Sequence, residues 1–90
     1  MNNHRRKVIC ELFDKICDVR SQLEEIQTTL SDVRDEEQEA MDCIPENLQG
    51  SERYEKAEEA VDNLDNAVYE LDDVLSGLGE ALDSMDAAIE

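Results

Sequence analysis

Near the middle of the chain stand Ile44-Pro45-Glu46-Asn47-Leu48-Gln49-Gly50-Ser51, the stretch that interrupts a long apolar repeat. Proline cannot continue an α-helix and disfavours helical backbone at the residue before it, so one helix should end just before Pro45. Gly50 followed by Ser51 is typical of a loop residue and a helix N-cap. The sequence therefore predicts three segments: a helix over about 4–43, a loop over 44–51 and a second helix over about 52–90.

Apolar residues recur at alternating spacings of three and four on both sides of this loop. With Ile9 as position a, the a and d positions of the first run are Ile9, Leu12, Ile16, Val19, Leu23, Ile26, Leu30, Val33, Glu37, Ala40 and Ile44. The second run reads Tyr54, Ala57, Val61, Leu64, Val68, Leu71, Leu75, Leu78, Leu82, Met85 and Ile89. Only Glu37 is not apolar. Sustained a/d heptads predict left-handed coiled-coil packing.

The two runs are nearly equal in length, about 40 residues or ~60 Å each as helices. Equal arms and a short loop predict an all-α fold, an antiparallel helical hairpin of the coiled-coil type, unless the arms open to pair between chains. Folding the chain at the loop sets Ile9 near Ile89 and Leu30 near Val68.

The second helix carries more apolar surface than one partner helix needs. Its g column consists of small residues, Ala60, Ala67, Val74, Ala81 and Ala88. We predict self-association through this column, with two hairpins forming a dimeric four-helix bundle, because a lone two-helix hairpin buries little core. Gly77 and Gly79 also lie in this helix and predict a soft spot or kink near the open end of the hairpin.

Charge is high and unevenly distributed. Eight Lys and Arg stand against 25 Asp and Glu, a net charge of -17, yet residues 1–20 carry five basic and only three acidic side chains. In the hairpin, the basic start at Arg5, Arg6 and Lys7 should lie beside acids of the returning helix, namely Asp83, Asp86 and Glu90. Near the loop, acids crowd the C-terminal end of the first helix, where the helix dipole disfavours them.

We predict that a partner protein binds the acids near the loop and along the second helix, namely Glu36, Glu39, Asp42, Glu55, Glu58, Glu59, Asp62, Asp65, Asp72 and Asp73. Most follow each other at three or four residues, about 5–6 Å apart, and few have a Lys or Arg nearby. Such a surface attracts basic proteins and repels nucleic acid and anionic membranes. The alternative interpretation is a solvated face of an ordinary acidic coiled coil.

Residues for catalysis or cofactor binding are scarce. His4 is the single histidine, and the sequence has neither a Gly-rich phosphate loop nor a Ca²⁺-binding loop motif, so we expect no enzyme, no catalytic or metal site and no cofactor. Cys10, Cys17 and Cys43 include no C-x-x-C pair and should be reduced thiols. No apolar run approaches the ~18 residues of a membrane span, and we expect a cytoplasmic protein.

The loop and the start of the second helix carry a resemblance. Asp35-Glu36-Glu37-Gln38-Glu39-Ala40, followed by residues 44–57, resembles small acidic helical proteins encoded by phages and mobile elements of Gram-positive bacteria. That resemblance implies an infected bacterial host cell as the setting, where some such proteins are nucleic-acid mimics that block CRISPR or restriction nucleases. The expected function is therefore an anti-CRISPR-like inhibitor that binds the basic groove of a host defence nuclease as a DNA mimic. Two alternatives are an adaptor coiled coil for oligomerisation and an antitoxin-like partner of a basic toxin.

Overall fold

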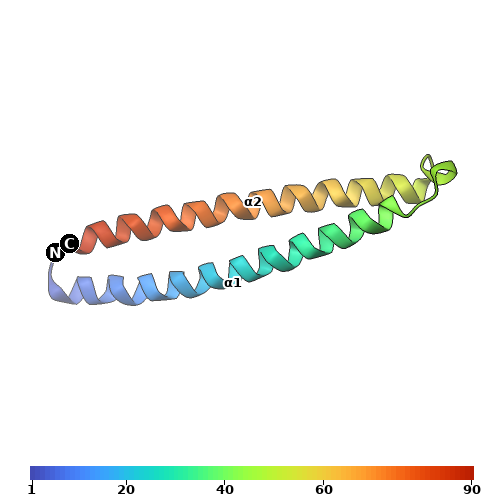
Figure 1. Cartoon of the computed structure of the whole chain (residues 1–90). Coiled ribbons are helices and arrows are strands. Elements are labelled where there is room, and N and C mark those ends of the chain that lie inside the picture. The colour runs from blue at the N-terminus through green and yellow to red at the C-terminus, as the bar shows by residue number, and fades with distance from the viewer.

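The computed structural model describes all 90 residues and contains two long helices joined by a short loop. α1 runs over Asn3–Asp42, a single 3-10 turn (η1) over Glu46–Leu48, and α2 over Glu52–Ile89. The helices lie side by side in opposite directions, with both termini at one end and η1 at the other (Figure 1). The predicted all-α antiparallel hairpin is confirmed. It is an extended rod of 70 × 15 × 14 Å.

Both helices begin at a side-chain cap. Asn2 Oδ1 accepts a hydrogen bond from the Arg5 amide (2.9 Å), and Ser51 Oγ accepts one from the Tyr54 amide (3.3 Å). Such caps satisfy one of the amides that a helix start leaves without a backbone partner. After α1, the loop is closed by backbone bonds from the Leu48 amide to the Pro45 carbonyl (2.8 Å) and from the Ser51 amide to the Leu48 carbonyl (3.0 Å).

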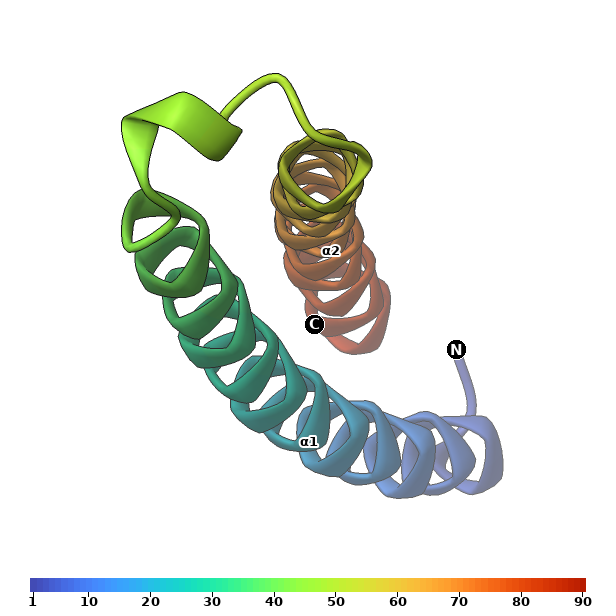
Figure 2. The same ribbon diagram turned by 90° about the vertical axis from the view of Figure 1, so that its right-hand side faces the viewer.

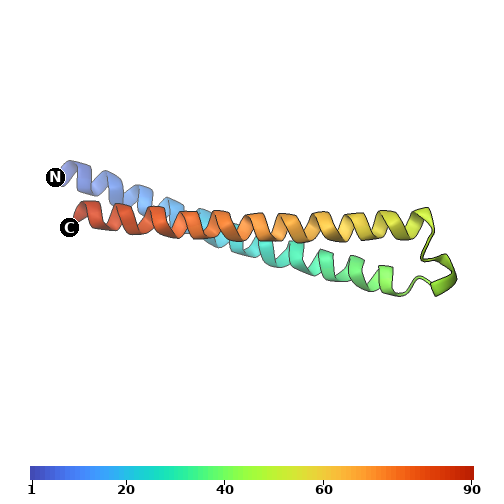
Figure 3. The same ribbon diagram turned by 90° about the horizontal axis from the view of Figure 1, so that it is seen from above.

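Three side chains of α1 show how the helices are aligned. Arg34 Nε donates to Asp65 Oδ1 (2.6 Å), Gln27 Nε2 donates to the Val68 carbonyl (3.0 Å), and Arg6 Nε donates to the Ile89 carbonyl (3.3 Å). The start of α1 therefore lies beside the end of α2, in the predicted sense. Figure 3 shows that α1 crosses α2 at a shallow angle, as expected for coiled-coil-like packing.

α2 faces α1 with its predicted a and d positions. All eleven of these residues are buried or half-buried, and Val61 and Leu82 are the most enclosed, with 4% and 5% of their surface exposed. Met41 and Ile44, beside the loop, are the other two buried residues. The core is thus one thin seam, because no third layer covers the pair of helices (Figure 2).

α1 faces α2 differently from the prediction. Its a column is at least half-buried, but the d column, which we expected in the core, is exposed: Leu12, Val19, Ile26, Val33 and Ala40. The e column takes its place, with Phe13, Gln27 and Arg34 half-buried and Met41 buried. The predicted a/d seam is therefore wrong for α1, which is turned by about 50° toward its e column. Gln27 and Arg34 explain the turn, because their side chains donate hydrogen bonds to acceptors on α2. The apolar residues of the d column have no donors with which to make such bonds.

The predicted kink near Gly77 and Gly79 is absent. α2 is one continuous helix from Glu52 to Ile89. Its ribbon curves smoothly along its whole length (Figure 1).

Candidate protein-binding surface

One side of α2 carries a row of carboxylates. We call seven of the predicted residues the acidic flank: Glu55, Glu58, Glu59, Asp62, Asp65, Asp72 and Asp73. All seven are exposed. They occupy the b, e and f columns of the heptad, which span about 100° of the helix circumference. The row is about 27 Å long.

Few cations neutralise this row. From Ala57 to Ile89 the chain contains ten Asp and Glu and no Lys or Arg. Asp65 is the one residue of the acidic flank that forms an ion pair, with Arg34, and Asp72 Oδ1 accepts a hydrogen bond from Gln27 Nε2 (3.3 Å). The other five carboxylates have no cationic partner, so their charges face solvent.

Arg34 forms the one ion pair between the helices. Its Nε lies 2.6 Å from Asp65 Oδ1 and its Nη1 3.2 Å from Asp35 Oδ1. The hydrogen bond to Asp65, and to a smaller extent the one to Asp35, raises the pKa of the guanidinium above its ordinary value, so Arg34 stays charged. Asp65 thus has a structural role, and Arg34, Gln27, Asp65 and Asp72 together define the hydrogen-bonded edge of the hairpin.

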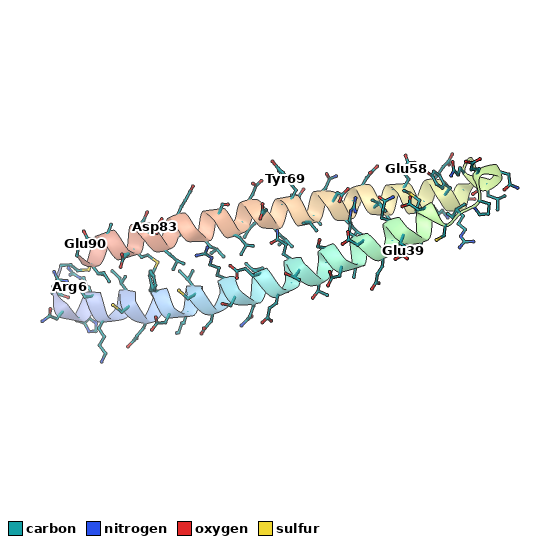
Figure 4. All side chains as sticks on the ribbon, in the orientation of Figure 1. Arg6, Glu39, Glu58, Tyr69, Asp83 and Glu90 are labelled. Carbon is teal, nitrogen blue, oxygen red and sulfur yellow. The ribbon has the colours of Figure 1, made fainter.

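The three predicted residues of α1 do not extend the acidic flank. Glu36, Glu39 and Asp42 are exposed, and Asp42 Oδ1 accepts a hydrogen bond from Gln38 Nε2 (3.0 Å). Figure 4 shows Glu39 and Glu58 pointing away from each other, on the outer sides of α1 and α2. The ten predicted residues therefore form two groups, because the hairpin separates the outer sides of its helices.

The loop end has a shallow depression on its surface. Glu37, Ala40, Met41 and Ile44 line it from one arm, and Glu52, Arg53, Lys56 and Ala57 from the other. Lys56 Nζ pairs with Glu52 (3.1 Å), and Arg53 forms no ion pair. These two cations leave most of the acids at the end of α1 unpaired.

The basic start of α1 meets the end of α2, the predicted neighbour, through a backbone carbonyl and without an ion pair. None of Asp83, Asp86 and Glu90 forms an ion pair with Arg5, Arg6 or Lys7. Arg6 instead donates to the Ile89 carbonyl, one of the last acceptors of α2. A cation is favourable at a helix C-terminus, where the carbonyl groups carry partial negative charge.

The g column of α2, which we predicted to mediate self-association, is only partly exposed to solvent. Ala60 and Ala67 are half-buried, while Val74, Ala81 and Ala88 are exposed. The larger apolar surface is the d column of α1, which sequence reasoning assigned to the core. Gln27 and Arg34, long polar side chains on the e side of α1, were the available signal that α1 could turn away from a symmetric a/d seam.

The remaining chemical groups are dispersed. Cys10 and Cys43 are exposed, Cys17 is half-buried, and all three are free thiols. No three His, Cys, Asp or Glu side chains are placed to hold a metal ion. Neither helix has a stretch apolar enough to cross a lipid bilayer. Comparison with protein-family models, curated proteins and solved structures found no match to this chain.

Proposed function

We propose that the acidic flank of α2 binds the basic surface of a nucleic-acid-binding protein and inhibits it by charge mimicry. The observation that carries this proposal is the run from Ala57 to Ile89, with ten carboxylates and no cation of its own. A defence nuclease of a bacterial host, such as a CRISPR or restriction enzyme, is the target class that the resemblance near the loop suggests.

The spacing of the carboxylates supports mimicry of a strand. Seven groups over about 27 Å give one charge per ~4 Å, close to the ~3.4 Å between phosphates along one DNA strand. A rigid helix holds these charges in place before binding, so little conformational entropy is lost when a partner docks.

The arrangement of the carboxylates also costs helix stability. Glu58, Asp62 and Asp65 follow each other at three or four residues, and like charges at this spacing destabilise a helix by about 0.2–0.5 kcal/mol per pair. Solubility needs far less net charge than -17. A basic partner would relieve this repulsion, which gives the excess charge a role.

The test uses neutral, nearly isosteric substitutions. The variant Glu58→Gln, Asp62→Asn, Asp73→Asn removes three unpaired charges and leaves the Asp65 pair with Arg34 intact. The matched control, Asp14→Asn, Asp18→Asn, Glu25→Gln, removes three exposed charges from α1. Both should keep the far-ultraviolet circular dichroism of a helical hairpin.

Each protein is immobilised and exposed to lysate of a Gram-positive bacterium, and the retained proteins are identified by mass spectrometry. The native chain and the control should retain nucleic-acid-binding proteins that added DNA displaces. The α2 variant should bind them about 10- to 100-fold more weakly, since three screened ion pairs are lost. Equal retention by all three proteins, unaffected by DNA and by 0.5 M NaCl, would refute charge mimicry.

The adaptor function is the second candidate, and the exposed d column of α1 favours it. An oligomerising coiled coil uses apolar columns as contacts and needs no charged face. In the same capture experiment, an adaptor would lose its partners with substitutions at Val19 or Val33 and keep them with the α2 variant.

A further inference from the structure

An apolar strip follows one edge of the hairpin. We call it the apolar edge: Leu12, Val19, Ile26, Val33 and Ala40 of α1, with Ala60, Ala67, Val74, Ala81 and Ala88 of α2. The larger members are well exposed, with 54% of Ile26, 47% of Val19 and 49% of Val74 in contact with solvent. A shallow depression runs beside Ile26, Leu30 and Val33.

Both columns lie on the same edge. Each member stands one position before the e column of α1 or the a column of α2, and all of those residues except the exposed Arg20 are buried or half-buried in the seam. In an antiparallel pair, the positions just before the seam columns of the two helices fall on the same side. The polar groups Gln27, Arg34, Asp65 and Asp72 occupy the opposite edge. Arg34 and Asp65 lie at the same height along the rod. Counting back along α1 and forward along α2 from this pair places Ile26 at about the height of Val74, in the middle of the strip.

The exposed area exceeds what a folded chain of this size normally leaves in solvent. The hairpin exposes 6646 Å², whereas a compact monomer of 10.2 kDa exposes about 5,300 Å². The excess, about 1,300 Å², is larger than the ~800 Å² that each partner buries in a standard-size interface. Covering the apolar edge would turn the thin seam into a full core.

We propose that a second copy of this chain covers the apolar edge. The two hairpins point in opposite directions, so that the loop end of one lies beside the termini of the other. The two columns are symmetric about Ile26 and Val74, since their members are placed seven residues apart on either side. A two-fold axis across the rod at this level brings Ile26 against Ile26, Val74 against Val74, and Val19 against Val33 of the second copy. Symmetric dimers require such a self-complementary surface.

Charge selects this orientation over one with the loop ends together. Residues 35–46 carry six acids and no Lys or Arg, while residues 1–20 carry an excess of two basic groups. The opposed arrangement places the basic start of each α1 over the acidic end of the other α1, with Lys15 level with Glu36 and Glu37. With the loop ends together, two acidic ends would repel each other.

A second copy on the apolar edge would leave the acidic flank uncovered, whatever the acidic flank binds. The acidic flank lies on the other side of α2, so each dimer would display two acidic flanks, pointing outward.

The first experiment measures mass by sedimentation equilibrium from 1 to 100 µM. The native chain should have about twice 10.2 kDa. Ile26→Glu should weaken association at least about 100-fold, because two carboxylates would be buried against each other without partners. The control, Thr28→Glu, adds the same charge two residues away, outside the apolar edge, and should remain dimeric. Circular dichroism should show both variants helical, since Ile26 is exposed within one hairpin.

The second experiment tests orientation by oxidative cross-linking, with the three native cysteines replaced by Ser. Ile26→Cys should form an intermolecular disulfide in high yield, because the two sites meet at the axis. Leu12→Cys should not, since its two copies would be about 40 Å apart. With the loop ends together, Ile26 would face the Val74 level of the second copy, and Ile26→Cys would not cross-link.

A native chain that is monomeric at 100 µM overturns the proposal. A folded Ile26→Glu variant that remains as dimeric as the native chain also overturns it, because the interface would then lie elsewhere. If Ile26→Glu fails to fold, the cross-link at Ile26→Cys decides, and its absence from a dimeric chain refutes the opposed orientation.

Discussion

At the scale of single residues, a few polar side chains position the helices. Asn2 and Ser51 cap the helix starts, and Arg34 connects α1 to α2 through Asp65. Hydrogen bonds to Asp65 and Asp35 raise the pKa of the Arg34 guanidinium further above its ordinary value, so Arg34 stays a cation in the hydrogen-bonded edge. Gly77 and Gly79, by contrast, have no packing role: a Cβ at either position would meet no atom within 4 Å.

Gly77→Ala should therefore stabilise the protein. Alanine in a helix interior is favoured over glycine by about 1 kcal/mol, which should raise Tm by about 5 °C for a chain of this length. Thermal unfolding followed by circular dichroism at 222 nm measures the change, and Gly77→Ser should give about half the gain. A lower Tm for Gly77→Ala would mean that α2 needs flexibility at this point.

At the scale of elements, the two helices use their apolar residues differently. α2 buries its a and d columns in one seam, whereas α1 contributes its a column and parts of its e column and leaves the d column in solvent. Leu82 and Val74, both in α2, show the contrast: 5% of Leu82 is exposed, and about half of Val74. Position relative to the seam, more than residue type, should decide the cost of truncation.

Leu82→Ala should lower the free energy of unfolding by about 2–3 kcal/mol, because it removes buried methyl groups and leaves a cavity. Val74→Ala should cost under about 1 kcal/mol when both are measured in the Ile26→Glu background, where a second copy does not contribute. Urea unfolding followed by circular dichroism gives both values. Equal costs would show that the seam is not centred on the a and d columns of α2.

At the scale of the whole molecule, the rod has a large charge and few internal ion pairs. The net charge is -17, and one ion pair, Arg34–Asp65, connects the helices. Repulsion among carboxylates therefore opposes the close approach of α1 and α2, and in the proposed dimer it opposes association too. Salt screens both this repulsion and the attraction to the proposed basic partner, so it should stabilise the fold and weaken the binding.

Raising NaCl from 0.02 to 0.5 M should increase Tm by about 5 °C, because screening weakens like-charge repulsion. The same change should weaken the binding to a basic partner that we propose. The variant Glu58→Gln, Asp62→Asn, Asp73→Asn should start with a higher Tm and gain less from salt. Differential scanning calorimetry at several salt concentrations tests this, and a Tm that falls with salt would contradict net repulsion as the dominant charge effect.

The amino-acid sequence by itself determined the two helices, the loop between them and their antiparallel pairing. Proline at 45 ends one helix and Ser51 caps the next, and both are local effects of neighbouring residues. The heptads require an apolar partner for each arm, and the short loop between arms of nearly equal length supplies the other arm as that partner. The a/d seam of α2 was predictable for the same reason, since its apolar columns are unambiguous.

Only the tertiary structure decided which side of α1 meets α2, and with it the apolar edge and the division of the ten predicted acids. The d and e columns flank the a column at similar angles, so spacing alone does not choose between them. The choice depends on groups of the other helix, the Asp65 carboxylate and the Val68 carbonyl, that Arg34 and Gln27 reach across the seam. Arg6 likewise depends on the other helix, since it donates to the Ile89 carbonyl. Contacts between residues far apart in the chain depend on the level and rotation of both helices, which appear only when the two are packed together.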